Sequence, residues 1–100
     1  MADLVNTVQQ IMEGYAVKAA NGYSYLTRSM DGQMFTVVYI GNVRGETVID
    51  TGLVTRLQDN KIIIEHDANS KPLVDALLQA GIPRDQIILA YAGEPAPEPS

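Results

Sequence analysis

His66, the only histidine of the chain, stands between two carboxylates in the run Glu65-His66-Asp67. An imidazole beside a carboxylate is suited to general-base catalysis or to metal binding. A zinc site needs three or four ligands, however, and the chain offers no second histidine and no cysteine. The lack of cysteine also excludes disulfides and thiol nucleophiles. We therefore interpret His66 as a structural or surface residue, and we predict no catalytic residue, no metal and no cofactor.

Carboxylates and glycines supply two further patterns that could carry chemistry. Four aspartates match no calcium-binding EF-hand loop, and turns, a strand end and an exposed helix face account for them: Asp31, Asp59, Asp67 and Asp75. The segment 41–45 is not a phosphate-binding loop, because no Lys-Ser or Lys-Thr pair follows it and a strand comes next. We predict a β-turn there, with Arg44 exposed at its tip.

Aromatic residues gather in one predicted hairpin, where alternation puts Tyr23 and Tyr25 on one face and Phe35 and Tyr39 on the other. These side chains either pack in the core with their hydroxyls at its edge or form an apolar contact surface. Tyrosine is a preferred contact residue at interfaces. We therefore predict a surface for a protein partner or a small ligand, made of Tyr23, Tyr25, Arg28, Phe35, Tyr39 and Arg44.

An amphipathic helix opens the chain. Apolar residues recur at three- and four-residue spacing over residues 3–20. Asp3 is placed to act as the N-cap, and Asn21-Gly22 is a good stop because both residues tolerate the left-handed conformation. Gly14 lowers the helix propensity in the middle and could divide the segment.

A second helix follows the predicted strands. Pro72 lies in its first turn, where the missing amide costs nothing, and Asn69 or Ser70 is expected to cap it. Gly81 ends this helix. Residues 84–90 then fit a short helix or an extended segment equally well, because the apolar run is too short for its period to decide.

Four strands are predicted between the helices, over residues 23–30, 33–43, 46–57 and 61–65. Asp31-Gly32 predicts a type I′ turn, whose positive φ angles match the twist of the flanking strands. Tight turns at Gly45 and at Asp59-Asn60 join the remaining strands. Three consecutive hairpins give an antiparallel meander.

The turns also fix the register of the strands. They predict four cross-strand pairs: Tyr25 with Val38, Arg28 with Phe35, Thr55 with Ile64, and Leu57 with Ile62. Arg28 could therefore stack on the ring of Phe35 as a cation–π pair. Strict alternation along the third strand puts one set of residues on a single face: Thr47, Ile49, Thr51, Leu53, Thr55 and Leu57. We expect one face of this strand to be buried and the other to be wet.

This order of elements predicts an α+β fold. A four-stranded antiparallel meander would carry the N-terminal and C-terminal helices on one face, in a roll-like arrangement, because an apolar sheet face must be covered. We assign residues 1–91 to a single domain of this kind. Residues 92–100 are rich in proline, and we predict a disordered tail there.

Composition limits the classes of function. The chain has 100 residues, a net charge of -5 and seven Lys and Arg that do not cluster. Nucleic-acid binding relies on clustered cations, so we expect no direct DNA or RNA contact. We also expect no membrane association and a cytoplasmic location, since we recognise neither a secretory signal nor a membrane-spanning run.

The second half of the chain resembles the XisI-like proteins of cyanobacteria, the fdxN element excision controlling factors. A strand, a polar loop, an amphipathic helix and a Gly-Ile-Pro break carry the resemblance, at Lys61, Ile62, Ile64, Asp67, Leu73, Leu77, Gly81, Ile82, Pro83, Asp85, Ile87 and Leu89. By architecture and size the chain is also similar to a small cyanobacterial α+β family linked to the regulation of biofilm formation. The XisI resemblance implies a controlling factor for excision of a DNA element, which works beside a nuclease-like partner and is not itself a catalyst.

We therefore predict a non-enzymatic regulatory or adaptor protein that acts through protein–protein contacts, with biofilm regulation as one setting. Two alternatives stay open at this point. The first is an accessory factor for DNA excision that acts through a nuclease-like partner. The second is a small-ligand module with a hydrophobic pocket between sheet and helices. The oligomeric state also stays open, and an edge strand would offer one route to a dimer.

Overall fold

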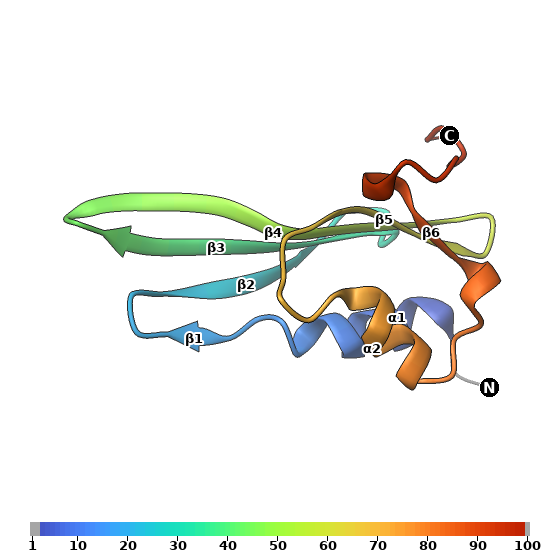
Figure 1. Cartoon of the computed structure of the whole chain (residues 1–100), viewed down its shortest axis with the longest axis horizontal. Coiled ribbons are helices and arrows are strands. Elements are labelled where there is room, and N and C mark those ends of the chain that lie inside the picture. Colours follow the sequence, from blue (N-terminus) through green and yellow to red (C-terminus); the bar gives the residue numbers. More distant parts are fainter. Residues whose placement is uncertain (1–2, 100) are drawn as a thin grey trace.

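A mixed β-sheet organises the chain, and both α-helices of the described residues lie on one side of it (Figure 1). The computed structural model describes residues 3–99. In chain order the elements are α1 (Leu4–Glu13), β1 (Lys18–Ala19), β2 (Gly22–Arg28), β3 (Met34–Val43), β4 (Glu46–Gln58), β5 (Lys61–Asp67), α2 (Leu73–Gln79), η1 (Arg84–Gln86), β6 (Ile87–Leu89) and η2 (Ala90–Ala92). The α+β class predicted from the sequence is confirmed.

The sheet has six strands in the order β1-β2-β3-β4-β5-β6, where the sequence predicted four. All neighbours are antiparallel except β5 and β6, which are parallel. β6 returns beside β5 after a connection that contains α2, as a parallel pair requires. β1 consists of two residues that the sequence pattern assigned to the first helix. Both additions lie at the edges of the sheet, so the predicted meander survives between them.

α1 ends at Gly14 and not at residue 20 as predicted. Its start agrees with the prediction, because the Asp3 carboxylate accepts a hydrogen bond from the Val5 amide at 3.1 Å. Glycine has low helix propensity, and here it closes the helix instead of merely weakening it. The next residue, Tyr15, donates its hydroxyl to the Lys71 carbonyl at 2.9 Å, which ties the end of α1 to the loop before α2.

The turn between β2 and β3 is not the predicted type I′ turn. Only Gly32 has a positive φ, of 75°, and the loop is closed by a hydrogen bond from the Ser29 amide to the Met34 carbonyl. The Asp31 carboxylate accepts from the Ser29 hydroxyl at 2.6 Å and from the Gln33 amide at 3.0 Å. The aspartate thus holds a wider loop, which leaves the predicted strand register unchanged.

The tight two-residue turns occur at the other two hairpins. Arg44 and Gly45 have φ angles of 55° and 83°, and Asp59 and Asn60 have 53° and 62°. Two consecutive positive φ angles define the turn type that fits twisted antiparallel strands. All four predicted cross-strand pairs are confirmed, including Tyr25 with Val38.

A β-bulge at Gly52 overturns the predicted alternation along β4. Val37 pairs with Leu53 and Val38 pairs with Thr51, so Gly52 is the extra residue on β4. The side chains change faces at this point, because the period of two is interrupted. Leu53, Thr55 and Leu57 face the helices, whereas Thr47, Ile49 and Thr51 face away from them, so the prediction of a single face for all six residues is wrong.

The core lies between the helices and the sheet face that they cover, which we call the inner face. It contains Val8, Met12, Phe35, Val37, Leu53, Leu57, Ile62, Ile64, Leu73, Leu77 and Ile87. One polar residue is buried with them: Thr55 is fully buried, and its hydroxyl has no hydrogen-bond partner within the described residues. An unpaired buried hydroxyl is costly.

The cap of α2 comes from the end of β5. The Asp67 carboxylate accepts from the Leu73 amide at 2.7 Å and from the Asn69 amide at 3.0 Å. The predicted caps, Asn69 and Ser70, do not take this place, because Pro72 is extended and the chain needs an acceptor from further away. The strand end and the helix start are thereby fixed to each other by one carboxylate.

The segment after η2, which we predicted to be a disordered tail, crosses the sheet on the side away from the helices (Figure 1). Arg56 donates to the Pro97 carbonyl at 2.5 Å, and Gln58 donates to the Glu98 carbonyl at 2.7 Å. We call this side of the sheet the outer face. Ile63 faces outward, opposite Arg56, and is nevertheless fully buried. The segment therefore covers the outer face over β4 and β5.

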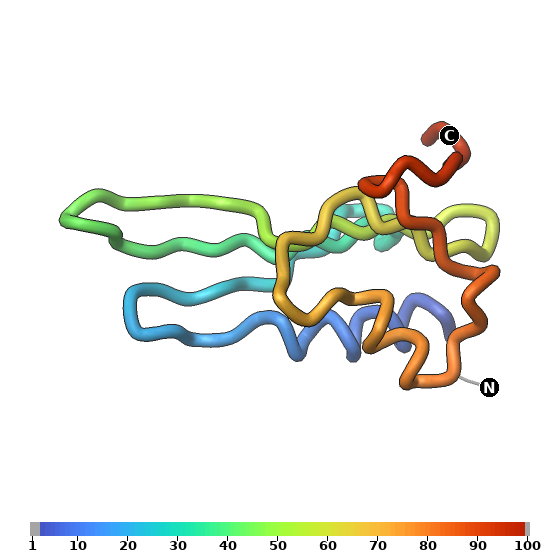
Figure 2. Tube along the Cα trace, viewed as in Figure 1, coloured from blue at the N-terminus to red at the C-terminus, as the bar shows by residue number. Residues whose placement is uncertain are grey.

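The other end of the sheet extends beyond the helices, which gives the molecule a longest dimension of 43 Å (Figure 2). We call this part the arm, and it consists of β1 with residues 22–25, 38–43 and 46–51. No helix of the described chain covers it on either face. Its side chains are accordingly far more exposed than those of the same strands over the helices.

Candidate interaction surface

The outer face of the arm carries two cross-strand rows of apolar side chains. The register places Lys18, Tyr23, Ile40 and Ile49 side by side in one row, and Tyr25, Val38 and Thr51 in the next. Tyr23 is 42% exposed, Tyr25 51% and Ile49 69%. Directly opposed residues in a sheet form a continuous surface. The rows therefore present aromatic and aliphatic area to solvent.

The two tyrosines form an aromatic pair within this surface. Their ring centroids are 5.0 Å apart, and the rings are inclined by 79°. An edge-to-face arrangement at this distance is favourable for aromatic rings. A contact of this kind favours one arrangement of the two rings, and a pre-arranged pair loses less side-chain entropy on binding than two independent side chains.

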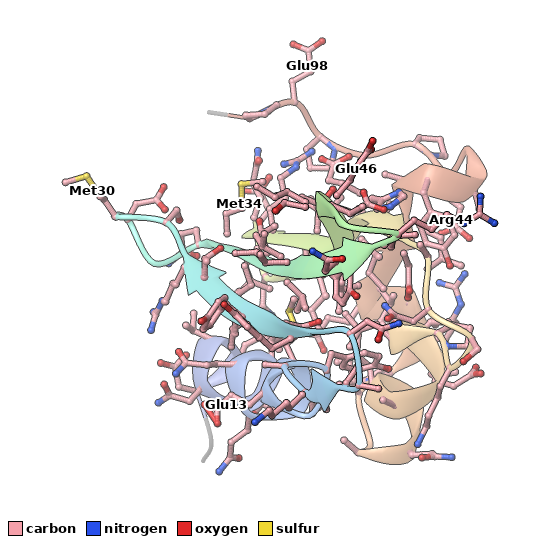
Figure 3. All side chains as sticks on the ribbon, turned by 90° about the vertical axis from the view of Figure 1, so that its left-hand side faces the viewer. Glu13, Met30, Met34, Arg44, Glu46 and Glu98 are labelled. Carbon is pink, nitrogen blue, oxygen red and sulfur yellow. The ribbon has the colours of Figure 1, made fainter. Side chains whose placement is uncertain are left out.

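Charge is distributed unequally between the two faces of the arm. Lys18 is the one ionisable group in the rows other than the tyrosine hydroxyls, although the chain as a whole has a net charge of -5. The arm carboxylates Glu46 and Asp50 belong to the opposite face, since Asp50 pairs with Tyr39. Figure 3 views the molecule from the tip of the arm, with Glu98 in the C-terminal segment and Glu13 at the end of α1. The outer face of the arm is therefore apolar and free of carboxylates.

Of the six residues predicted for a contact surface, only Tyr23 and Tyr25 lie together on this face. Phe35 is fully buried in the core, so its assignment to the surface is wrong. The reason is its register, which places it opposite Thr55 under α1 and α2. Arg28 lies on the same side as Phe35, with its guanidinium carbon 5.3 Å from the ring centroid, as the predicted cation–π pair requires.

The side chain of Tyr39 lies on the inner face of the arm. It is half-buried, and a side-chain carbon on Gly41 would overlap its ring and hydroxyl. A side-chain carbon on Gly22 would overlap the backbone of Ile40 and Gly41 and would also approach the Tyr39 hydroxyl. The two glycines are directly paired across β2 and β3, so the ring covers backbone that has no side chains of its own. Tyr39 is thus a packing residue, and it points away from Tyr23 and Tyr25.

Arg44 is exposed at the tip of the β3–β4 hairpin (Figure 3). Its positive φ of 55° places it in the tight turn, and Asn42 accepts a hydrogen bond from the Gly45 amide at 3.0 Å to close that turn. The tip lies at the end of both faces, so Arg44 is a neighbour of the outer rows and not a member of them.

The sequence pattern missed three members of the outer face: Val38, Ile40 and Ile49. Ile49 was placed on the same face as Leu53 and Leu57 because alternation was carried through Gly52. A glycine inside a strand is itself the signal that could have corrected this, since it often marks a bulge.

The candidate residues for chemistry do not form a site. His66 is exposed and pairs with Val54 on the outer face, and Asp67 caps α2. Asp59 lies in a turn, and Asp75 is exposed in the first turn of α2. Among residues 3–99, no group of three or more His, Cys, Asp or Glu is placed to hold a metal ion.

Among the hollows formed by residues 3–99, two lie away from the arm. One, of about 390 Å³, is formed by the end of α1 and the loop before α2, where Tyr15 and Lys71 meet. Burial raises the pKa of Tyr15, and Asp67 and Asp75 raise it further. The other, of about 480 Å³, lies on the outer face beside Met34 and Arg56, next to the C-terminal segment. Neither lies between sheet and helices, where the ligand hypothesis placed its pocket.

No helix in the part of the chain that the structure describes is long and apolar enough to cross a bilayer.

Comparisons with known proteins agree on one family. The fold is similar to a XisI-like protein from Anabaena variabilis, with 17% identity, a TM-score of 0.73 and coverage of 85% of this chain and 81% of that one. It is also similar to the fdxN element excision controlling factor XisI from Anabaena variabilis, with 26% identity, a TM-score of 0.67 and coverage of 87% and 88%. No curated protein matches.

The family model described as XisI protein matches residues 2–97, nearly the whole chain. The resemblance inferred from the second half of the sequence is thereby confirmed, and the chain belongs to the XisI family.

Proposed function

We propose that this protein is a non-enzymatic controlling factor that acts by binding a protein partner through the outer face of its arm. One observation carries the proposal: Tyr23, Tyr25 and Ile49 are 42%, 51% and 69% exposed on a surface without carboxylates. Large exposed apolar area on a small protein marks an interaction site. Tyrosines at the centre of such a patch are frequent hot spots.

The process that we propose is excision of a DNA element. One similar protein of known structure is the fdxN element excision controlling factor XisI, and this chain matches the same family model along nearly its whole length. We extend the controlling role to this chain on that basis. No observation favours a role in biofilm regulation over this one, and the positions of the two hollows give no support to a ligand module.

The charge of the chain favours action through a partner. Its seven cations are scattered, and the net charge is -5, so the isolated protein repels the DNA backbone. Excision requires DNA strands to be cut and rejoined. We therefore assign the DNA contact to a nuclease-like protein, to which this protein would bind as a regulatory subunit.

The test combines binding and excision in the organism that encodes the chain. The gene is deleted and then replaced by wild type, by the double variant Tyr23→Ser with Tyr25→Ser, or by Tyr91→Ser. Tyr91 is a matched control, because it is 42% exposed like Tyr23 but lies in η2, away from the arm. Excision is counted by sequencing across the joined ends of chromosomal elements, and the tagged proteins are purified with their partners.

We expect the deletion and the double variant to lose excision and to lose the same DNA-processing partner, while Tyr91→Ser keeps both. A hot-spot tyrosine contributes about 2 kcal/mol or more, so partner affinity should fall about 30-fold or more. Normal excision after deletion of the gene would contradict the proposed role in excision. If the double variant loses excision but still binds the partner fully, the partner does not bind through the outer face of the arm.

A further inference from the structure

Half of β4 is an open strand edge. β4 pairs with β5 from Leu53 to Gln58 only, whereas its pairing with β3 continues to Glu46. Within residues 3–99, the stretch 46–51 therefore has a neighbour strand on one side and solvent on the other (Figure 2). An unpaired edge presents backbone donors and acceptors to any further strand.

The direction of these backbone groups follows from the hydrogen bonds of β3. The Asn42 amide donates to the Asn21 carbonyl, so the groups of Asn42 point toward β2. Backbone groups alternate along a strand, and those of Tyr39 and Gly41 therefore point toward β4. Their partners there are Asp50 and Val48. It follows that the residues with outward amides and carbonyls are Thr47, Ile49 and Thr51.

The edge strand on the same side of the sheet, β6, is closed by side chains. Arg84 donates to the Ile87 carbonyl at 2.8 Å, and the Glu94 carboxylate accepts from the Leu89 amide at 2.9 Å. An ion pair of 2.6 Å joins these two side chains across β6. Charged side chains at an edge prevent further pairing. On the β4 edge, one comparable contact is described, from the Thr51 amide to the Asp50 carboxylate at 2.8 Å.

We propose that the open edge of β4 pairs with the same edge of a second copy, as an antiparallel two-fold dimer. The sequence on this edge, Thr47-Val48-Ile49-Asp50-Thr51, has Ile49 at its centre and a threonine at each end. A two-fold axis through Ile49 puts Thr47 opposite Thr51 of the second copy and Val48 opposite Asp50. β-branched residues pair well across strands, so the contacts are of the type that stabilises a sheet.

Charge selects this register among its neighbours. An axis through Val48 would put Glu46 opposite Asp50 twice, and an axis through Asp50 would put that carboxylate opposite itself. Like charges directly opposed destabilise a strand pair. The axis through Ile49 has no such contact. The ladder ends at Thr51, because Ala68 and Asn69 already donate to the Gly52 carbonyl, and the bulge at Gly52 bends β4 away at that point.

The dimer also accounts for the exposure of Ile49. At 69% it is one of the most exposed aliphatic residues of the described chain, and it ends the row that begins at Tyr23 and Ile40. In the dimer this row would continue directly into Ile49, Ile40 and Tyr23 of the second copy. The apolar rows of two arms would then form one surface.

The first test measures mass against concentration by sedimentation equilibrium, starting from a chain mass of 10.9 kDa. We expect a reversible dimer. Ile49→Pro removes an outward amide without removing an internal hydrogen bond, and should weaken the dimer about tenfold or more. Ile49→Thr is the matched control, because it keeps the amide and a β-branched side chain, and it should dimerise. Circular dichroism checks that all three proteins fold.

The second test fixes the register. The chain contains no cysteine, so single variants report one contact each. Ile49→Cys should oxidise to a covalent dimer, because residues opposite themselves have α-carbons about 5.5 Å apart, within the range of a disulfide. Val48→Cys and Asp50→Cys should not.

Two results would overturn the proposal. One is a monomer at all concentrations. The other is a dimer that survives Ile49→Pro and is crosslinked by Tyr25→Cys instead of Ile49→Cys, since that dimer would pack through its outer faces. The first result leaves partner binding by the outer face untouched, whereas the second would place another copy on that face. The excision experiment tests partner binding separately.

Discussion

At the scale of single residues, the most informative defect of the core is the hydroxyl of Thr55. The side chain is fully buried on the inner face, and its oxygen has no hydrogen-bond partner within the described residues. A buried unpaired polar group costs about 1–3 kcal/mol, and valine has nearly the same shape. We expect Thr55→Val to raise the free energy of unfolding by about 1–2 kcal/mol.

Thermal and urea unfolding measure this change, and a gain of about 1 kcal/mol corresponds to about 4–8 °C in Tm for a chain of this size. Thr51→Val is the control, because Thr51 is exposed on the outer face and should change stability by less than about 0.5 kcal/mol. A loss of stability in Thr55→Val would mean that its hydroxyl is paired in solution.

A second prediction at this scale concerns Gly41. A side-chain carbon there would overlap the ring of Tyr39, which lies across the paired glycines of β2 and β3. Overpacking of this kind costs about 1–3 kcal/mol, so Gly41→Ala should lower stability by that amount. Gly52→Ala is the matched control, because its nearest contact would be the Asn69 side-chain oxygen at 3.9 Å. Urea unfolding of both variants separates the two cases, and equal losses would show that Tyr39 moves aside freely.

At the scale of elements, one carboxylate joins β5 to α2. Asp67 accepts from the Leu73 amide at 2.7 Å and from both nitrogens of Asn69. Loss of a helix cap costs about 0.5–2 kcal/mol, and here a loop loses its acceptor as well. We expect Asp67→Ala to lower the free energy of unfolding by about 2 kcal/mol. Asp75→Ala should cost less than half of that, since Asp75 is exposed and acts only on the helix dipole.

Native-state hydrogen exchange shows which elements lose stability in Asp67→Ala. Amides of α2 should lose protection in Asp67→Ala, while amides of β2 and β3 should change only as far as global stability does. A uniform change in all elements would contradict the assignment of Asp67 to the cap.

The edge at β6 gives a prediction for pH. The Leu89 amide and Arg84 lower the pKa of Glu94 below its ordinary value of 4.5. A lowered pKa contributes stability that is present above 4.5 and is lost as the pH falls through the folded value. Unfolding by urea at pH 7 and at steps down to pH 3 should show Glu94→Gln less stable than wild type at pH 7, with a difference that shrinks toward pH 3. Parallel curves would show that the carboxylate is not held at the edge.

The helices and strands also show which features a local sequence pattern can predict and which it cannot. Registers between adjacent strands were correct, such as Tyr25 with Val38, because short turns leave few alternatives. Residues 84–90 were predicted as either a short helix or an extended segment, and they contain both η1 and β6. The pattern could not decide, because Ile87–Leu89 pairs with a strand more than twenty residues earlier and no local period reports that contact. Asp67 was missed as a cap because it lies six residues before Leu73, further away than the N-cap position. Such contacts are decided by packing, which a local pattern does not contain.

Two of the six residues predicted for the candidate surface lie on it. Tyr23 and Tyr25 were placed correctly on one face, since alternation within β2 is unbroken. Phe35 was wrong because period alone does not say which face the helices cover. Ile49 was placed on the same face as Leu53 and Leu57 because the prediction did not include the bulge, which reverses every side chain beyond it. Bulges depend on both strands, and the glycine at the bulge was the only local sign.

At the scale of the whole molecule, the net charge and the charge of the outer face differ, and they favour different partners. The chain is acidic overall, with twelve Asp and Glu against seven Lys and Arg, yet the outer face of the arm bears no carboxylate. Long-range repulsion keeps such molecules from anionic surfaces, while a neutral patch still permits close contact with a selected protein. A dimer through β4 would double the charge and also double the patch.

This distribution predicts the behaviour of the isolated protein toward DNA. Affinity for a duplex depends on how many phosphates the cations neutralise, and scattered cations in an acidic chain neutralise few. We expect fluorescence anisotropy with a labelled duplex to show no binding at about 150 mM salt. At low salt any weak signal should vanish steeply as salt rises. When the purified partner is added, we expect binding to the duplex with the affinity that the partner alone has for DNA. Salt-resistant binding by the protein alone would place the DNA contact on this chain, and would require a site outside the apolar rows of the arm.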